Sequence, residues 1–75
     1  MRTLADLAVG SRGKIARIVG TDEVCCRLLE MGLTPGVEVM LLGVAPLGDP
    51  LELEFRGYRL SVRKSEAAKV ELEPA

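Results

Sequence analysis

The sequence predicts a mainly β domain, a small barrel of five short strands with one helix inserted after the first strand. Three observations lead to this prediction. Apolar and polar residues alternate over 51–55 and again over 58–63. One apolar repeat with helical spacing runs over 24–31 and stops at Gly32. Segments containing Gly or Pro separate the apolar runs, as turns between short strands require.

The first part of the chain predicts a helical turn followed by a bent strand. Thr3 can cap a single turn over residues 4–7. Residues 13–19 then read as a strand, with Ile15 and Ile18 among its apolar positions. Because these residues break strict alternation, we expect a bulge or a strong bend inside this strand.

The main helix is expected over about residues 22–31. Asp22 is the expected N-cap, since its carboxylate can accept a hydrogen bond from the free amides of the first turn. Apolar residues spaced three and four apart form a stripe of Val24, Leu28 and Met31, broadened by Cys25 and Leu29. Gly32 suits a left-handed residue after the helix, and Pro35-Gly36 suits a type II turn.

Residues 37–44 predict a second strand that is apolar on both faces. The face toward the core carries Val37, Val39 and Leu41. The opposite face carries Met40, Leu42 and Val44. This second stripe is either buried by the helix or the chain ends, or exposed as a surface for a partner.

The two alternating segments predict a hairpin with Arg56-Gly57 as its turn. The expected pairs on one face are Phe55 with Tyr58, Leu53 with Leu60 and Leu51 with Val62. This register puts Tyr58 near the core. Arg is a poor first residue for a type I′ turn, so a bulged turn is the alternative. Ser65 is the expected cap of a following helical turn, and Val70 and Leu72 belong to a short closing strand.

Five strands of this length close most economically as a small SH3-like barrel. An OB-like barrel is the alternative, but its helix normally lies between the third and fourth strands. We expect residues 1–75 to form one such domain, with short helical turns near both ends. The composition is 48% hydrophobic and 3% aromatic, so the core should be aliphatic.

The composition argues against catalysis and nucleic-acid binding. The chain has no histidine, the commonest general base and zinc ligand, so we expect no enzymatic activity. The net charge is −1, whereas nucleic-acid binders usually carry a basic excess. Neither a signal peptide nor a membrane span stands out, and we expect a cytoplasmic protein.

Two adjacent cysteines, Cys25 and Cys26, are the candidate metal ligands. Neighbouring residues of a helix point about 100° apart, so these two thiols cannot form a disulfide without distortion. Two thiols make half a metal site at most. We expect one buried and one exposed cysteine and no cofactor, and a metal shared between two copies is the alternative.

The surface carries the remaining chemistry. Basic residues gather around the predicted hairpin, either as a contact surface or as a solvated face. A Pro- and Gly-containing loop presents Leu47 at its tip, which suits docking better than folding. The partner-binding candidates are Leu47, Met40, Leu42, Arg56, Arg59 and Arg63. An unpaired strand edge or the second apolar stripe would also suit a weak homodimer.

Three segments resemble the hallmark sequences of the ferrous iron transport protein A (FeoA) family. They are Arg27-Leu28-Leu29-Glu30-Met31-Gly32-Leu33-Thr34-Pro35-Gly36, Ala45-Pro46-Leu47-Gly48-Asp49-Pro50, and residues 56–67. The resemblance implies an SH3-like barrel and a small cytoplasmic accessory or regulatory protein of ferrous iron uptake. Its implied partner is the cytoplasmic side of the membrane GTPase iron transporter, FeoB. It implies no catalytic site.

Similar domains also end some metal-dependent transcriptional repressors. A metal-responsive regulator, or an interaction module related to those repressor domains, is therefore the alternative function. No helix-turn-helix segment precedes the predicted barrel, so this alternative fits less well. The resemblance leaves open the docking face, the stoichiometry, and whether the protein changes GTP hydrolysis.

Overall fold

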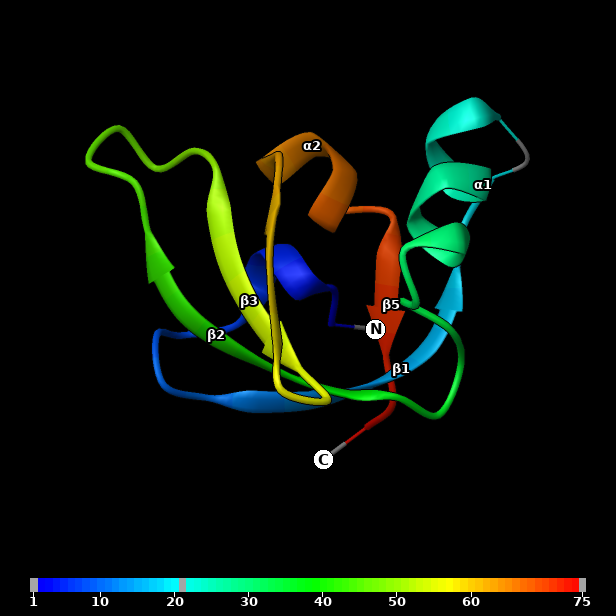
Figure 1. The fold of residues 1–75 in the computed structure, drawn as a ribbon, viewed down its shortest axis with the longest axis horizontal. Coiled ribbons are helices and arrows are strands. Elements are labelled where there is room, and N and C mark those ends of the chain that lie inside the picture. The colour runs from blue at the N-terminus through cyan, green and yellow to red at the C-terminus, as the bar shows by residue number, and fades with distance from the viewer. Residues whose placement is uncertain (1, 21, 75) are drawn as a thin grey trace.

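A computed structural model describes residues 2–20 and 22–74, and within them five strands form one antiparallel sheet (Figure 1). The strands are β1 (Arg12–Ile18), β2 (Glu38–Val44), β3 (Leu51–Phe55), β4 (Tyr58–Val62) and β5 (Val70–Leu72). The helices are the 3-10 turn η1 (Leu4–Asp6), α1 (Glu23–Glu30) and α2 (Lys64–Ala67). The order across the sheet is β4-β3-β2-β1-β5, so β4 and β5 are its edges. The mainly β prediction, with one main helix after the first strand, is confirmed.

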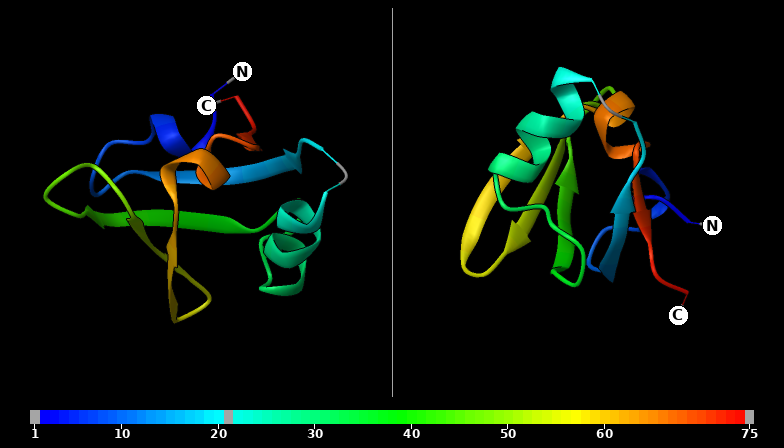
Figure 2. Two further views of the ribbon diagram at one scale, coloured as in Figure 1. Left: turned by 90° about the horizontal axis from the view of Figure 1, so that it is seen from above. Right: turned by 90° about the vertical axis from the view of Figure 1, so that its right-hand side faces the viewer.

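Bulges bend the two long strands, β1 and β2. The register shifts between Ile15 and Arg17 of β1 and between Leu41 and Gly43 of β2. The first shift confirms the bend expected from the broken alternation of β1. An extra residue increases the local twist of a strand, and in the left panel of Figure 2 the hairpin of β3 and β4 crosses the direction of β1 and β2.

Local signals define both ends of α1. The Asp22 carboxylate accepts a hydrogen bond from the Cys25 amide at 3.1 Å, which confirms the predicted N-cap. At the other end Gly32 has a φ of 104°, and the Leu33 amide bonds back to the Leu28 carbonyl at 3.1 Å. This is the Schellman arrangement, in which a glycine takes the left-handed position and a following apolar residue folds back on the helix.

The core is aliphatic, as predicted. Its largest fully buried side chains are Leu4, Ile15, Leu28, Leu33, Leu41, Leu53, Leu72, Val39, Val62 and Val70. The right panel of Figure 2 shows α1 at one end of the barrel, between the β3–β4 hairpin and the β1–β5 pair. Only Cys25 and Leu28 of α1 are buried, while Leu29 is exposed. The buried stripe is narrower than predicted because the helix covers one end of the barrel and not a whole sheet face.

The N-terminal segment covers the β5 edge of the sheet. Thr3 forms an antiparallel bridge with Glu71, and the Leu72 amide donates to the Arg2 carbonyl at 2.8 Å. The Thr3 amide donates to the Asp6 carboxylate at 2.9 Å, so Thr3 begins η1 as predicted. This end of the chain therefore supplies hydrogen bonds beyond the last strand on that side.

The β3–β4 hairpin has the predicted register. Arg56 and Gly57 have φ values of 52° and 81°, which matches a two-residue type I′ turn and removes the need for a bulged one. Phe55 faces Tyr58 across this turn.

The start of α2 differs from the prediction. The N-cap is Arg63, and Ser65 lies inside the helix. The Lys64 amide donates to the Asp49 carboxylate at 2.9 Å, and the Arg63 amide donates to the Glu66 carboxylate at 3.0 Å. The prediction of Ser65 as the cap is therefore wrong. The free amide of Lys64 donates to the Asp49 carboxylate of the β2–β3 loop instead.

Candidate protein-docking surface

The inner face of the sheet is covered along β3 and at Val62 of β4, and it opens toward the hairpin turn at Leu60 and Tyr58. Leu53 and Phe55 of β3 are buried, and Phe55 is 7% exposed. Their cross-strand partners on β4 differ, since Leu60 is half-buried and Tyr58 is 70% exposed. The prediction of Tyr58 near the core is wrong although its register is right, because Tyr58 lies at the turn end of an edge strand, where the described residues leave it exposed.

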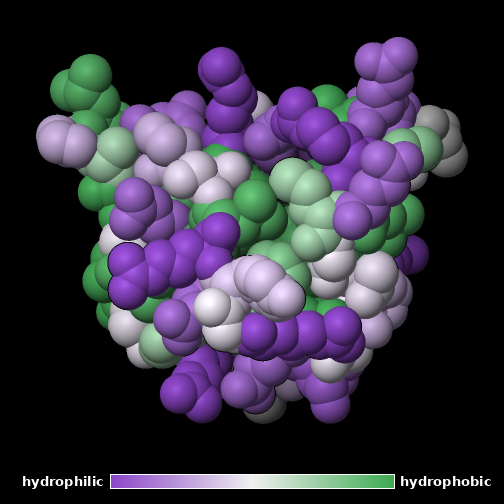
Figure 3. Space-filling view, viewed as in Figure 1, coloured by the Kyte–Doolittle hydropathy of each residue, from purple (hydrophilic) through white to green (hydrophobic). Residues whose placement is uncertain are grey.

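A groove of about 370 Å³ lies between the C-terminal end of α1 and the hairpin. Its lining is Met31, Gly32, Phe55, Arg56, Tyr58, Arg59 and Leu60. A neighbouring hollow shares Met31 and continues past Ser61 and Val62 to Arg63. We call the surface formed by Met31, Gly32, Phe55, Arg56 and residues 58–63 the β4 groove. Figure 3 shows hydrophobic atoms in the centre of this face, bordered by hydrophilic ones.

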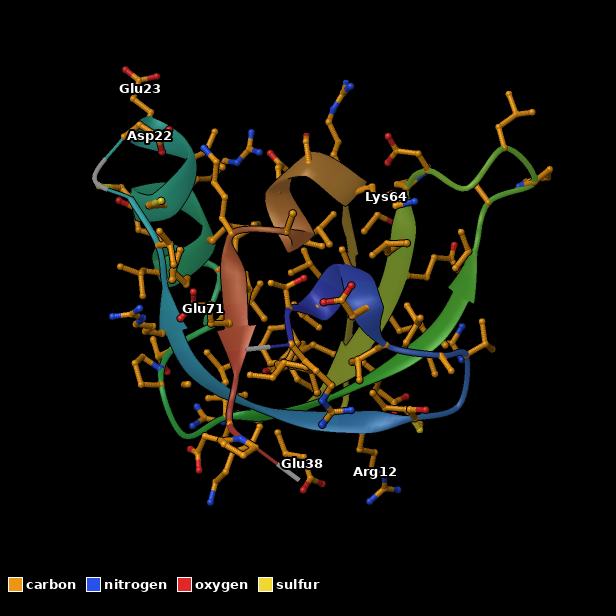
Figure 4. All side chains as sticks on the ribbon, turned by 180° about the vertical axis from the view of Figure 1, so that it is seen from behind. Arg12, Asp22, Glu23, Glu38, Lys64 and Glu71 are labelled. Atoms are coloured by element: carbon orange, nitrogen blue, oxygen red, sulfur yellow. The ribbon has the colours of Figure 1, made fainter. Side chains whose placement is uncertain are left out.

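The cations along the β4 groove have no ion-pair partner among the residues that the structure describes. Ion pairs found elsewhere are Arg12–Glu38, Arg17–Glu71, Arg27–Glu66 and Lys69–Asp22. Figure 4 shows the first of these side by side below β1. The cations of the groove and its end are Arg56, Arg59, Arg63 and Lys64. Glu54 faces Arg59 across the hairpin without coming within ion-pair distance.

Leu47 lies at the tip of the β2–β3 loop and is 97% exposed. The Gly48 amide bonds to the Ala45 carbonyl at 2.7 Å, and the Ala45 amide bonds to the Pro50 carbonyl at 3.1 Å. Figure 3 shows hydrophobic atoms projecting from the tip of this loop. The loop therefore holds an apolar side chain in water on a hydrogen-bonded turn, and Pro50 at its base also lines the hollow beside Arg63.

Met40 and Leu42 do not line the β4 groove. After the register shift that follows Leu41, Val44 pairs with Leu51, a core residue. The extra residue at the bulge moves Val44 to the inner face, so the predicted stripe of Met40, Leu42 and Val44 is wrong. Met40 and Leu42 are half-buried, and Met40 lines another hollow of about 180 Å³, which shares Phe55 and Arg56 with the β4 groove.

Cys25 and Cys26 have different surroundings, as predicted. Cys25 is buried and its thiol donates to the Val19 carbonyl at 3.1 Å, whereas Cys26 is exposed. Burial raises the pKa of the Cys25 thiol, and the nearby Asp22 carboxylate adds to this. Among the described residues, no group of three or more His, Cys, Asp and Glu side chains is placed to hold a metal ion.

Two ion pairs connect α1 to the C-terminal part of the chain. Arg27 pairs with Glu66 of α2, which is buried. Asp22 accepts from the Lys69 ammonium at 2.8 Å, and this bond, followed by the Cys25 amide, lowers the pKa of Asp22 to about 2. Neither pair was predicted from the sequence, because their members lie 39 and 47 residues apart.

No helix in the described part of the chain is long and apolar enough to cross a membrane. A family model, the FeoA domain, matches residues 2–74. The Fe(2+) transport protein A/Fe(2+) transporter FeoB fusion protein of Porphyromonas gingivalis is 36% identical over 70 residues, which cover 93% of this chain. The matched part is 8% of that relative's length.

Two solved structures show the same architecture. An FeoA-like protein of Clostridium acetobutylicum matches with a TM-score of 0.88 and 39% identity, over 95% of this chain and 83% of that one. FeoA of Stenotrophomonas maltophilia, solved with zinc and described as a prokaryotic SH3 domain protein, matches with a TM-score of 0.85 and 27% identity, over 97% of this chain and 91% of that one. These likenesses confirm the predicted SH3-like barrel. The chain belongs to the FeoA family.

Proposed function

We propose that this protein is a non-catalytic accessory of ferrous iron uptake that binds the cytoplasmic part of the FeoB transporter. One observation carries the proposal. In the relative from Porphyromonas gingivalis, a domain 36% identical to this chain is fused to FeoB. Fusion holds two domains at a high effective concentration, which is useful when they act on one another. A separate chain of the same family would reach its transporter by non-covalent docking.

The β4 groove supports this proposal as a docking surface. Protein interfaces combine an apolar centre with a polar rim, and Arg and Tyr are enriched in them. The lining of the groove combines the apolar Met31 and Leu60 with an exposed Tyr58 and with Arg56 and Arg59. Leu47 is a second exposed apolar side chain, carried by the β2–β3 loop.

The direct experiment measures binding of this protein to the recombinant cytoplasmic GTPase part of FeoB, with GDP, with a GTP analogue and without nucleotide. Saturable binding in at least one nucleotide state is expected. Leu47→Asp should weaken it, whereas Val9→Asp is the matched control, because Val9 is also exposed and lies outside the groove. Absence of binding in every nucleotide state would contradict the proposal.

A metal-responsive regulator is the second candidate function. The zinc complex of the Stenotrophomonas maltophilia FeoA favours it. Calorimetry with ferrous iron under anaerobic conditions, and with zinc, separates the two candidates. The accessory proposal expects no stoichiometric binding to a monomer. Stoichiometric binding that disappears in Cys26→Ser would support the regulator instead, because Cys26 is the exposed thiol.

A further inference from the structure

We infer that the free edge of β4 takes an extended segment of the partner as an additional strand. Apolar side chains of that segment would enter the β4 groove, and acidic side chains would meet Arg59 and Arg63. The inference rests on the proposed function, since it describes how the transporter would be held. The partner segment is defined by its chemistry, which alternates apolar and acidic residues.

The backbone of β4 has unused hydrogen-bonding groups on its outer edge. In an antiparallel ladder, hydrogen-bonded pairs alternate with non-bonded pairs. The two-residue turn makes Phe55–Tyr58 a bonded pair, so the amides and carbonyls of Arg59 and Ser61 point away from β3. Among the described residues, no other backbone or side-chain hydrogen bond uses these groups. An incoming strand would pair with them.

The two faces of β4 then dictate which side chains the segment needs. Tyr58 and Leu60 point to the inner face, where Met31 and Phe55 also line the groove. Arg59 points to the outer face, opposite Glu54. Residues of a neighbouring strand alternate in the same way. An added strand therefore presents every second residue to an apolar surface and the others to the face that carries Arg59 and Ser61.

The charge of this edge selects an acidic segment over a second copy of the chain. The arginines at the groove form no ion pair among the described residues, so an acidic side chain would find an available cation. Two copies paired through β4 would place the arginines of both copies on one face, and like charges on adjacent strands are unfavourable. If a second copy occupies the β4 edge instead, amide hydrogen exchange detects it.

Ser61→Pro tests the backbone contact directly. Proline removes the outward amide of Ser61 without removing a bond between β3 and β4, and proline is tolerated on edge strands for this reason. Ser61→Thr is the matched variant, because it changes the side chain and keeps the amide. We expect Ser61→Pro to bind the GTPase part of FeoB about tenfold more weakly than Ser61→Thr.

Amide hydrogen exchange measured by NMR gives a second readout on the unmodified protein. Binding should slow exchange at Arg59 and Ser61. Tyr58, Leu60 and Val62 are internal controls, since the ladder with β3 already occupies their amides. If FeoB binds with no added protection at Arg59 and Ser61 and with equal affinity for both Ser61 variants, the inference is wrong and the proposed function stands. Protection that depends on protein concentration alone would identify a second copy as the occupant and overturn the inference.

A synthetic probe separates the inference from the choice of partner. A short peptide alternating Glu and Leu should protect the same two amides, and a matched peptide alternating Lys and Leu should not. If the Glu peptide protects them while FeoB does not bind at all, the proposed function is wrong and the edge contact stands. If neither FeoB nor the Glu peptide protects them, the inference is overturned.

Discussion

The two edge strands of the sheet, β5 and β4, carry similar inward-facing apolar residues but end in different surroundings. On β5, Leu72 is 1% exposed, and the segment before η1 adds hydrogen bonds beyond the edge through Arg2 and Thr3. On β4, Val62 is 2% exposed but Tyr58 is 70% exposed, and no described segment adds hydrogen bonds to the outward groups of Arg59 and Ser61. The chain therefore covers one edge with its own backbone and leaves the other open, and an open edge is where another chain can add.

The two edges also differ in whether their charged side chains form ion pairs. Ion pairs connect β1 to β5 through Arg17 and Glu71, and α1 to the residue before β5 through Asp22 and Lys69 (Figure 4 labels Asp22 and Glu71). The arginines near β4 have no such partner in the described residues. Near β5, charged side chains are paired within the protein and so contribute to folding. Near β4, the arginines stay unpaired among the described residues and are available to a partner.

The largest expected effect is a difference in the free energy of unfolding between variants of the two edge strands. Leu72→Ala should lower the free energy of unfolding by about 3 kcal/mol, because it removes a fully buried side chain and leaves a cavity. Leu60→Ala should cost about 1 kcal/mol, since Leu60 is only half-buried. Urea denaturation of both variants measures the difference. Equal losses would show that the two edges are equally well covered.

A smaller effect concerns the wall of the β4 groove. Gly32→Ala should cost about 2 kcal/mol, because it combines a left-handed backbone with a Cβ only 3.0 Å from the Phe55 ring. Gly36→Ala is the matched control at about 1 kcal/mol, since Gly36 also has a positive φ but has open space around it. Thermal denaturation compares them, and an equal loss would mean that the ring contact is unimportant.

The ion pair between Asp22 and Lys69 predicts a pH dependence. Folding lowers the pKa of Asp22 from 3.8 to about 2, so its contribution to stability is fully present above pH 3.8 and is lost as the pH falls toward 2. Asp22→Asn keeps a capping residue and removes the titrating group. Denaturation midpoints measured across this range should fall more steeply for the unmodified protein than for Asp22→Asn. Parallel curves would exclude this pair as the cause.

The smallest expected effect on stability lies at the open edge. Tyr58→Ser should change the free energy of unfolding by less than about 0.5 kcal/mol, as is usual for exposed positions. The same variant should weaken binding to FeoB, since Tyr58 lines the β4 groove. Denaturation and a binding measurement on one preparation test both statements. A large loss of stability would show that Tyr58 belongs to the core after all.

Short-range signals in the sequence were enough for most of the fold. Asp22 and Gly32 mark the ends of α1, and the Arg56-Gly57 turn sets the register of the hairpin. Each of these features depends on groups within a few residues of one another, so propensity and turn chemistry decide them. The candidate site was predicted less completely, because Arg59 and Leu47 could be named from the sequence while the groove beside them could not.

The sequence by itself determined the strands, the helix and the aliphatic core, because their apolar spacing can be read along the chain. Only the tertiary structure decided which inward-facing residues are covered. Tyr58 has the same inward register as Val62, which is buried on the same edge strand, but Tyr58 lies at the open turn end, and Val44 changes face at a bulge. Asp49 reaches the start of α2 from another loop. Coverage and capping of this kind depend on groups that folding brings together, so they cannot be predicted from the spacing of residues along the chain.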